Sequence, residues 1–106
     1  MFFRQEASVH LLYLQLRRDI VGGRLSCTEN QILMLAGLAL RAEYGDQVDR
    51  VHEAPVDYYV SPRILNQLNH YQTGELIVSH YLQLAQVSEE DAERRFIKVR
   101  IHQGPS

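Results

Sequence analysis

The chain has 106 residues, of which 45% are hydrophobic, and its formal net charge is −2. This length fits one domain with one core, and the near-neutral charge argues against a dedicated nucleic-acid binder, which would be strongly basic. A single cysteine excludes an internal disulfide, and no hydrophobic run approaches the roughly 20 residues of a membrane span. We expect a soluble, intracellular domain over residues 1–106, ordered over about residues 8–102.

The first predicted helix covers residues 8–21. An apolar stripe at helical spacing contains Val9, Leu12, Tyr13, Leu16 and Ile20. A second apolar surface contains Leu11, Leu14 and Val21. We therefore expect neighbours on two sides of this helix. Gly22 and Gly23 should end it, because glycine adopts left-handed backbone conformations at little cost.

The second predicted helix has the clearest start in the chain. Thr28 and Gln31 are spaced as a capping box, in which each side chain bonds the other residue's backbone amide. Residues 32–42 are apolar almost all round, so we expect this helix at the centre of a helical bundle. Gly45 is its predicted end.

In the second half of the chain, we expect an irregular segment over residues 46–60, followed by helices. Ser61 and Pro62 are expected to open a short helical turn that reaches about residue 69, with serine as the cap and proline at the first helical position.

Two further long helices complete the predicted bundle. The third long helix is predicted over residues 73–86. Ser88 should cap the last helix, whose first turn is rich in acids. We thus expect an all-α bundle of four main helices and one short turn.

Residues that could carry catalysis or bind a metal form no recognised constellation. Gly22-Gly23-Arg24 follows a helix, whereas a phosphate-binding loop precedes one. Cys27 could form a thiolate at a helix N-terminus, although a buried apolar role is favoured. His80 is favoured as a hydrogen-bonded residue at the core edge over a metal ligand, and the five histidines lack zinc-site spacing. We expect no catalytic residue, cofactor or metal.

One basic cluster is a candidate contact surface. It consists of Arg94, Arg95, Lys98 and Arg100. It could contact an anionic lipid or an acidic partner. The alternative is a solvated helix face whose charges balance the acids just upstream at residues 89–93.

Two long stretches resemble the central lobe of FERM domains. They are YLQLRRDIVGGRLSC at residues 13–27 and ILMLAGLALRAEYGD at residues 32–46. DYYVSPRIL at 57–65 and DAERRFIKV at 91–99 are also similar to family segments. Within this family, the sequence is most similar to FERM/PDZ scaffolds and to FERM-containing non-receptor tyrosine phosphatases. One departure is Arg41, which stands where the family often has glutamine.

The resemblance implies a helical lobe similar to acyl-CoA-binding protein, docked between other FERM lobes of the parent chain. It implies a non-catalytic protein-interaction role in a membrane–cytoskeleton or junctional scaffold, at the inner face of the plasma membrane, the cytoskeleton or cell junctions. Implied partners are the neighbouring FERM lobes, cytoplasmic tails or junction proteins, and anionic phospholipid, with no nucleic acid.

An alternative of another class is an acyl-CoA or lipid-binding module. Such a module needs an apolar groove with cationic and aromatic groups close by. Candidate aromatic lining residues are Tyr58, Tyr59, Tyr71 and Tyr81. Fold analogy alone is weak evidence for this function.

Overall fold

The computed structural model describes residues 5–23 and 27–103, with side chains described for 8–23 and 27–99. The elements in chain order are α1 (Gln5–Val21), α2 (Glu29–Tyr44), α3 (Val48–Val51), the 3-10 helix η1 (Val56–Tyr58), α4 (Pro62–Gln67), α5 (His70–Leu82) and α6 (Glu89–Gln103). The described residues contain no strand. The all-α bundle of four main helices and a short turn is therefore confirmed.

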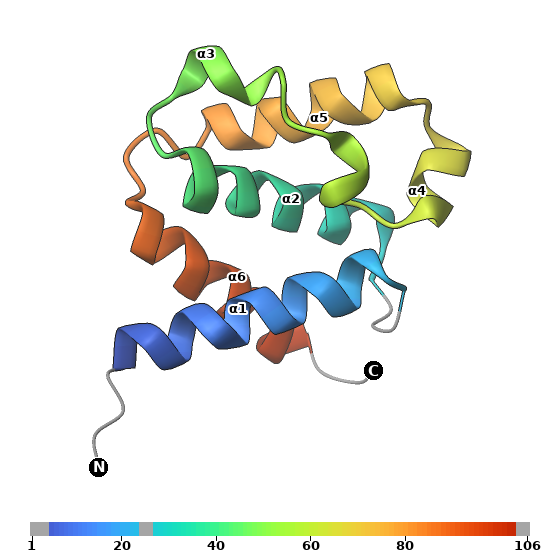
Figure 1. Ribbon diagram of the computed structural model, residues 1–106. Coiled ribbons are helices and arrows are strands. Elements are labelled where there is room, and N and C mark those ends of the chain that lie inside the picture. Colours follow the sequence, from blue (N-terminus) through green and yellow to red (C-terminus); the bar gives the residue numbers. More distant parts are fainter. Residues whose placement is uncertain (1–4, 24–26, 104–106) are drawn as a thin grey trace.

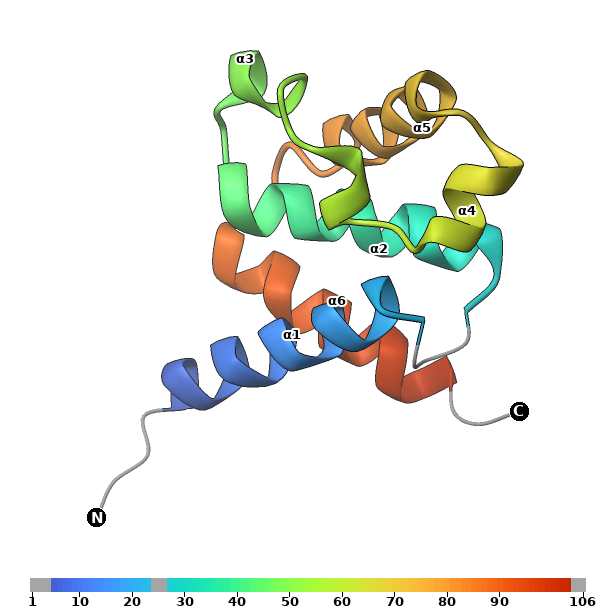
Figure 2. The same ribbon diagram turned by 45° about the vertical axis from the view of Figure 1, so that its right-hand side comes forward.

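Helix α2 lies in the middle of the bundle. It packs against α5 on one side and α6 on the other, and α1 lies beside α6 (Figure 1). The same layering is visible after rotation (Figure 2). Between residues 32 and 42, every side chain is buried except the partly buried Met34. The central position predicted from its all-round apolar surface is correct.

Local signals at the ends of α1 and α2 act as predicted. The Thr28 hydroxyl accepts from the Gln31 amide and the Gln31 side chain accepts from the Thr28 amide, which completes the capping box. Gly23 follows α1 with φ +79 and Gly45 follows α2 with φ +56, a backbone region that favours glycine.

Helices α2 and α5 cross at a close backbone approach. A Cβ placed on Gly37 would lie 2.5 Å from the Cβ of His80 and 3.2 Å from its carbonyl carbon. Only glycine fits at this crossing without moving one of the helices. The small residues of α2 thus set the distance at which α5 packs.

Arg41 fastens the end of α2 to the connection between α5 and α6. The buried guanidinium donates to three backbone carbonyls, those of Gly45 (2.7 Å), Ala85 (3.0 Å) and Val87 (2.5 Å), and it pairs with Asp46 at 2.8 Å. A buried charge is tolerated when its hydrogen bonds are satisfied in this way. Arginine, which departs from the family's frequent glutamine, therefore has a structural role here.

The segment over residues 46–60, helix α5 and the cap of α4 differ from the sequence-based expectation. Residues 46–60, here called the arm, were expected to be irregular but contain α3 and η1. Helix α5 was expected from residue 73 to 86 but begins at His70, because Asn69 and Gln72 form a second capping box, and it ends at Leu82. Ser61 precedes α4 as expected, but its buried hydroxyl makes no capping bond.

The described residues leave part of the second apolar surface of α1 bare. Leu11 is 65% exposed and Leu14 is 36% exposed, whereas Tyr13 and Ile20 are buried. The expectation of a neighbour on this second surface is therefore wrong for these two leucines, and Leu12 of the first stripe is also 41% exposed. Bare leucines on one helix face are uncommon in monomeric domains and indicate a contact surface.

Replacing Gly37 by alanine should lower the free energy of unfolding by about 2 kcal/mol, because the new methyl overpacks the α2–α5 crossing. Urea unfolding followed by circular dichroism measures this. The matched control is Gly74→Ala on α5, whose Cβ would meet a Val56 methyl at an ordinary 3.5 Å. Gly74→Ala should stabilise by roughly 0.5–1 kcal/mol, since alanine is favoured in helices. Equal effects of the two substitutions would contradict the close crossing.

Candidate functional site

A polar cluster surrounds Glu43 of α2. Its carboxylate accepts hydrogen bonds from the hydroxyls of Tyr13 on α1 (2.8 Å) and Tyr59 in the arm (2.9 Å). Arg17 pairs with the same carboxylate, and its guanidinium lies 4.5 Å from the centre of the Tyr59 ring. The cluster joins α1, α2 and the arm through one acidic side chain.

Both tyrosines are held in their protonated, donating form. Burial raises the pKa of Tyr13 and of Tyr59 well above the ordinary range, and the charge of Glu43 adds to the shift in each case. Tyrosines with a raised pKa release their protons less readily, so both hydroxyls can donate hydrogen bonds to the carboxylate over a wide pH range. The Glu43 cluster therefore holds α1 and the arm against α2.

A groove runs between α2, α5 and α6, and two of the predicted basic residues line it. Its volume is about 440 Å³. The lining residues are Met34, Leu38, His80, Gln83, Leu84, Arg95, Lys98 and Val99. Arg95 and Lys98 lie one helical turn apart and both are exposed, whereas Leu84 and Val99 are partly buried. The groove thus combines an apolar floor with a cationic edge.

The other two predicted basic residues do not line this groove. Arg94 points toward Glu90 one turn earlier, at 4.0 Å, as in the solvated-face alternative. The Arg100 side chain lies outside the described part. The apolar lining from α2 and from Leu84, just after α5, was missed in the sequence. The all-round apolar surface of α2 nevertheless indicated that more than one helix would meet it.

The remaining sequence candidates are structural within the described residues. Cys27 is buried at 7% exposure, and its carbonyl accepts from Arg63, which ties α4 to the start of α2. His80 is partly buried, as favoured, and lines the groove, but the described residues give its side chain no hydrogen bond. Arg24 lies outside the described residues. No group of three or more metal-ligand side chains occurs in the described part of the chain.

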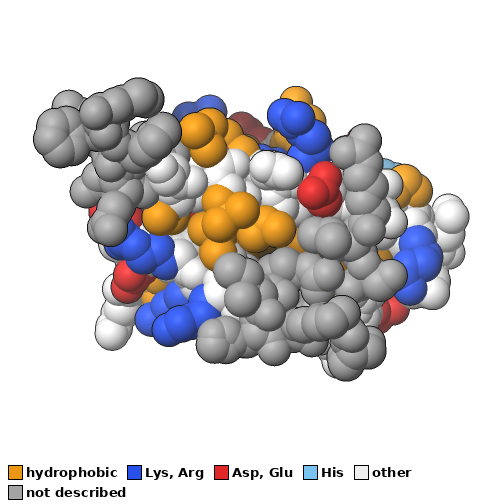
Figure 3. All heavy atoms as spheres, turned by 90° about the horizontal axis from the view of Figure 1, so that it is seen from below, with side chains coloured by type: hydrophobic (Ala, Val, Ile, Leu, Met, Phe, Trp, Pro, Cys, Tyr) orange, Lys and Arg blue, Asp and Glu red, His pale blue; other side chains and the backbone are white. Residues whose placement is uncertain are grey.

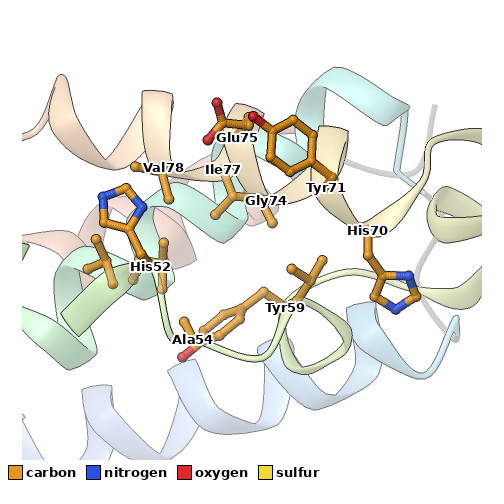
Figure 4. A pocket seen from close by; sticks show the side chains of 12 residues that line it. His52, Ala54, Tyr59, His70, Tyr71, Gly74, Glu75, Ile77 and Val78 are labelled. Atoms are coloured by element: carbon orange, nitrogen blue, oxygen red, sulfur yellow. The ribbon is translucent and has the colours of Figure 1, made fainter. Parts of the chain in front are cut away.

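A second hollow, here called the arm pocket, lies between the arm and α5 (Figure 4). Its volume is about 240 Å³. The lining residues are Leu40, Val51, His52, Ala54, Val56, Tyr59, His70, Tyr71, Gly74, Glu75, Ile77 and Val78. Figure 4 shows Tyr71 and Glu75 side by side on α5, with His52 and His70 towards opposite ends of the opening.

The tyrosines of the acyl-CoA alternative do not converge on the cationic groove. Tyr59 and Tyr71 line the arm pocket, Tyr58 is 66% exposed, and Tyr81 is buried with its hydroxyl on the Gly45 carbonyl. No lysine or arginine is among the described residues that line the arm pocket. Of these tyrosines, Tyr58 and Tyr59 lie near a cation, Arg17, and that guanidinium is already paired with Glu43. The groove and the arm pocket thus do not bring together the free cationic and aromatic groups that a nucleotide would need.

The face formed by α1 and α6 is a further exposed surface. Viewed from that side, hydrophobic side chains gather near the centre and lysine and arginine side chains lie around them (Figure 3). Leu11, Leu12 and Leu14 are the exposed leucines that α1 contributes. Among the described helices, none has the length and hydropathy to cross a bilayer.

Comparisons with known proteins agree on one family. The family model described as the FERM central domain matches residues 1–100. Mouse tyrosine-protein phosphatase non-receptor type 13 is 33% identical over 99 residues, which cover 91% of this chain and 4% of that protein. Mouse FERM and PDZ domain-containing protein 2 is 33% identical over 101 residues, covering 91% of this chain and 7% of the relative. Human Merlin is 26% identical over 100 residues, which cover 90% of this chain and 17% of Merlin.

The Glu43 cluster predicts a loss of stability at alkaline pH. Tyr13 and Tyr59 have a folded-state pKa raised above the unfolded value of 10.0, so their contribution is complete below that pH and falls as the pH rises from it towards the folded-state pKa. In the double variant Tyr13→Phe/Tyr59→Phe, the free energy of unfolding should therefore decline less between about pH 9 and pH 11 than in the parent chain.

Urea titrations across this pH range measure how far the free energy of unfolding declines in the parent chain and in the double variant. The control is Tyr71→Phe, which removes a hydroxyl from a tyrosine that is 76% exposed and should decline like the parent. Parallel declines for the double variant and the parent chain would contradict the Glu43 arrangement.

Proposed function

Because the chain belongs to the FERM central domain family, we propose that it is a non-catalytic protein-interaction lobe of a membrane–cytoskeleton or junctional scaffold. The chain spans only 4% to 17% of the relatives named above, so this role concerns one lobe of a larger assembly. We take residues 1–106 as one domain, ordered over about 8–102. Its proposed setting is the cytoplasmic side of the plasma membrane, the cytoskeleton or cell junctions.

The observation that carries the proposal is the groove with Arg95 and Lys98 on its edge. An apolar floor between packed helices suits apolar side chains of a partner, and a cationic edge attracts carboxylates. We propose that the groove binds an acidic, partly apolar segment of a protein, such as a cytoplasmic tail. Arg94 and Arg100, on the same helix, would add longer-range attraction that speeds association.

The bare leucines of α1 support a second contact, to a neighbouring FERM lobe of the parent chain. Leu11 and Leu14 lie three residues apart on one helix face and are exposed together. An obligate neighbour in the parent chain would cover them, which accounts for their lack of cover here. This contact is separate from the groove, because none of these leucines lines it.

A non-catalytic role fits the way in which the polar residues are used. The Glu43 carboxylate is occupied by two tyrosines and Arg17, and the Arg41 guanidinium is occupied by backbone carbonyls. Catalytic groups need access to a substrate and a pKa matched to proton transfer. These two groups instead hold helices together, and the charges that line the groove, Arg95 and Lys98, are exposed to a partner.

Reversing the charges on the groove edge should weaken partner binding. We expect Arg95→Glu/Lys98→Glu to reduce the affinity for acidic amphipathic peptides by at least about tenfold, mainly through the lost attraction. Fluorescence anisotropy with labelled peptides, in which leucines and glutamates are spaced one helical turn apart, measures the affinity. The control is Arg18→Glu/Arg50→Glu, which changes the net charge equally at exposed positions outside the groove.

Three outcomes would contradict this proposal. Equal weakening by both double variants would mean that net charge and not the groove decides binding. Binding of phosphatidylserine vesicles without binding of any peptide would replace the protein partner by a lipid surface. A saturating heat on calorimetric titration with an acyl-CoA that is abolished by Arg95→Glu/Lys98→Glu would support the carrier alternative instead.

A further inference from the structure

We propose that the arm pocket is a second protein-recognition site, which accepts one large apolar side chain flanked by lysine or arginine in a partner polypeptide. The pocket shares no lining residue with the groove, although both use α2 and α5. The proposal goes beyond the function proposed above, because it adds a separate site with the opposite charge preference. Each site can be tested without the other.

The size of the pocket fits a single side chain. Its volume of about 240 Å³ is below the roughly 300–1,000 Å³ that is typical of small-molecule sites. A cavity of roughly 150 Å³ already admits a benzene molecule. The space is thus suited to one ring or one branched aliphatic group, which is how anchor residues of a partner are usually accommodated at interfaces.

The floor of the pocket is apolar and is formed before any partner arrives. Leu40, Val51 and Ile77 are each 3% exposed or less, so their positions are fixed by core packing. They come from three different elements, α2, α3 and α5. Preorganisation of this kind lowers the ordering cost of binding.

Gly74 of α5 lines the pocket where α5 faces the arm. A Cβ at this position would meet a Val56 methyl at 3.5 Å, which is ordinary contact. A small residue here keeps the pocket open, and a larger side chain at the same position would occupy part of the space. Gly74 therefore provides a way to close the pocket from within.

The rim of the pocket selects a positively charged neighbour for the entering side chain. Glu75 is the carboxylate that lines the opening. The arm beside it is net acidic, because Asp49, Glu53 and Asp57 are exposed there against one arginine, Arg50. None of these four carboxylates takes part in an ion pair within the described residues. Because the lining contains no lysine or arginine, an anionic lipid or nucleotide is disfavoured and a basic peptide is favoured.

The exposed ring of Tyr71 beside the opening would enlarge the contact between a partner and the arm pocket. Tyr71 is 76% exposed on α5, and its ring lies next to the Glu75 carboxylate (Figure 4). A lysine or arginine of the partner placed there could pair with Glu75 and stack on the Tyr71 ring. Tyrosine at such a rim supplies contact area at a low entropic cost.

The test uses three blocked tripeptides as probes and follows amide signals by two-dimensional nuclear magnetic resonance. Lysine-tryptophan-lysine should shift the amide signals of lining residues, with an affinity at least about tenfold above those of lysine-alanine-lysine and glutamate-tryptophan-glutamate. The signals of His52, Gly74 and Ile77 report on the pocket, and those of Arg95 and Lys98 report on the groove.

Two variants assign the binding to this pocket. Gly74→Leu should abolish the shifts by filling the space, whereas the control Ser79→Leu adds the same side chain at an exposed position of α5 and should leave them intact. Glu75→Lys is an exposed substitution that tests the charge preference without risk to the fold, and it should lower the affinity at least about tenfold. Its control is Glu90→Lys on α6, which should have no effect.

Several results would overturn the proposal. Shifts confined to groove residues, equal affinity for all three tripeptides, or full binding by both Gly74→Leu and Glu75→Lys would each do so. None of these outcomes bears on the acidic peptides that test the groove, so the two sites remain distinguishable.

Discussion

Helix α2 must be enclosed by other helices, because apolar side chains point from it in nearly every direction. This requirement organises the whole chain. Helix α5 covers one side and approaches so closely at Gly37 that the Cβ of His80 leaves no room for a side chain. Helix α6 covers another side, and α1 lies against α6 and reaches α2 through the Glu43 cluster. The interior is therefore committed to packing, and recognition is left to the surfaces between the covering helices.

The polar residues at the end of α2 make this enclosure specific. Arg41 binds the connection that leads from α5 to α6, and Glu43 binds α1 and the arm. Two charged side chains thus help to fix where these three segments lie relative to α2, which hydrophobic packing alone would define less sharply. The groove and the arm pocket both lie beside α2 and α5, whose positions these contacts help to fix. Arg95 and Lys98 line the groove, and Glu75 lines the arm pocket.

The sequence predicts those features whose signals are local. The Thr28–Gln31 capping box, the glycine ends of α1 and α2, and the central position of α2 follow from residues close to one another in the chain. The arm was taken as irregular because α3 and η1 are too short to show a period, and α3 is anchored by the tertiary burial of Val51. Arg95 and Lys98 were singled out by charge, but the apolar floor beside them depends on how three helices meet.

Amide hydrogen exchange tests the enclosure of α2 most directly. The amides of residues 33–42 should exchange most slowly in the chain, and only through global unfolding, because α2 is covered on every side. The arm and the outer face of α1 should exchange faster through local openings. Exchange of the α2 amides as fast as that of α1, in a chain that remains folded by circular dichroism, would contradict the account.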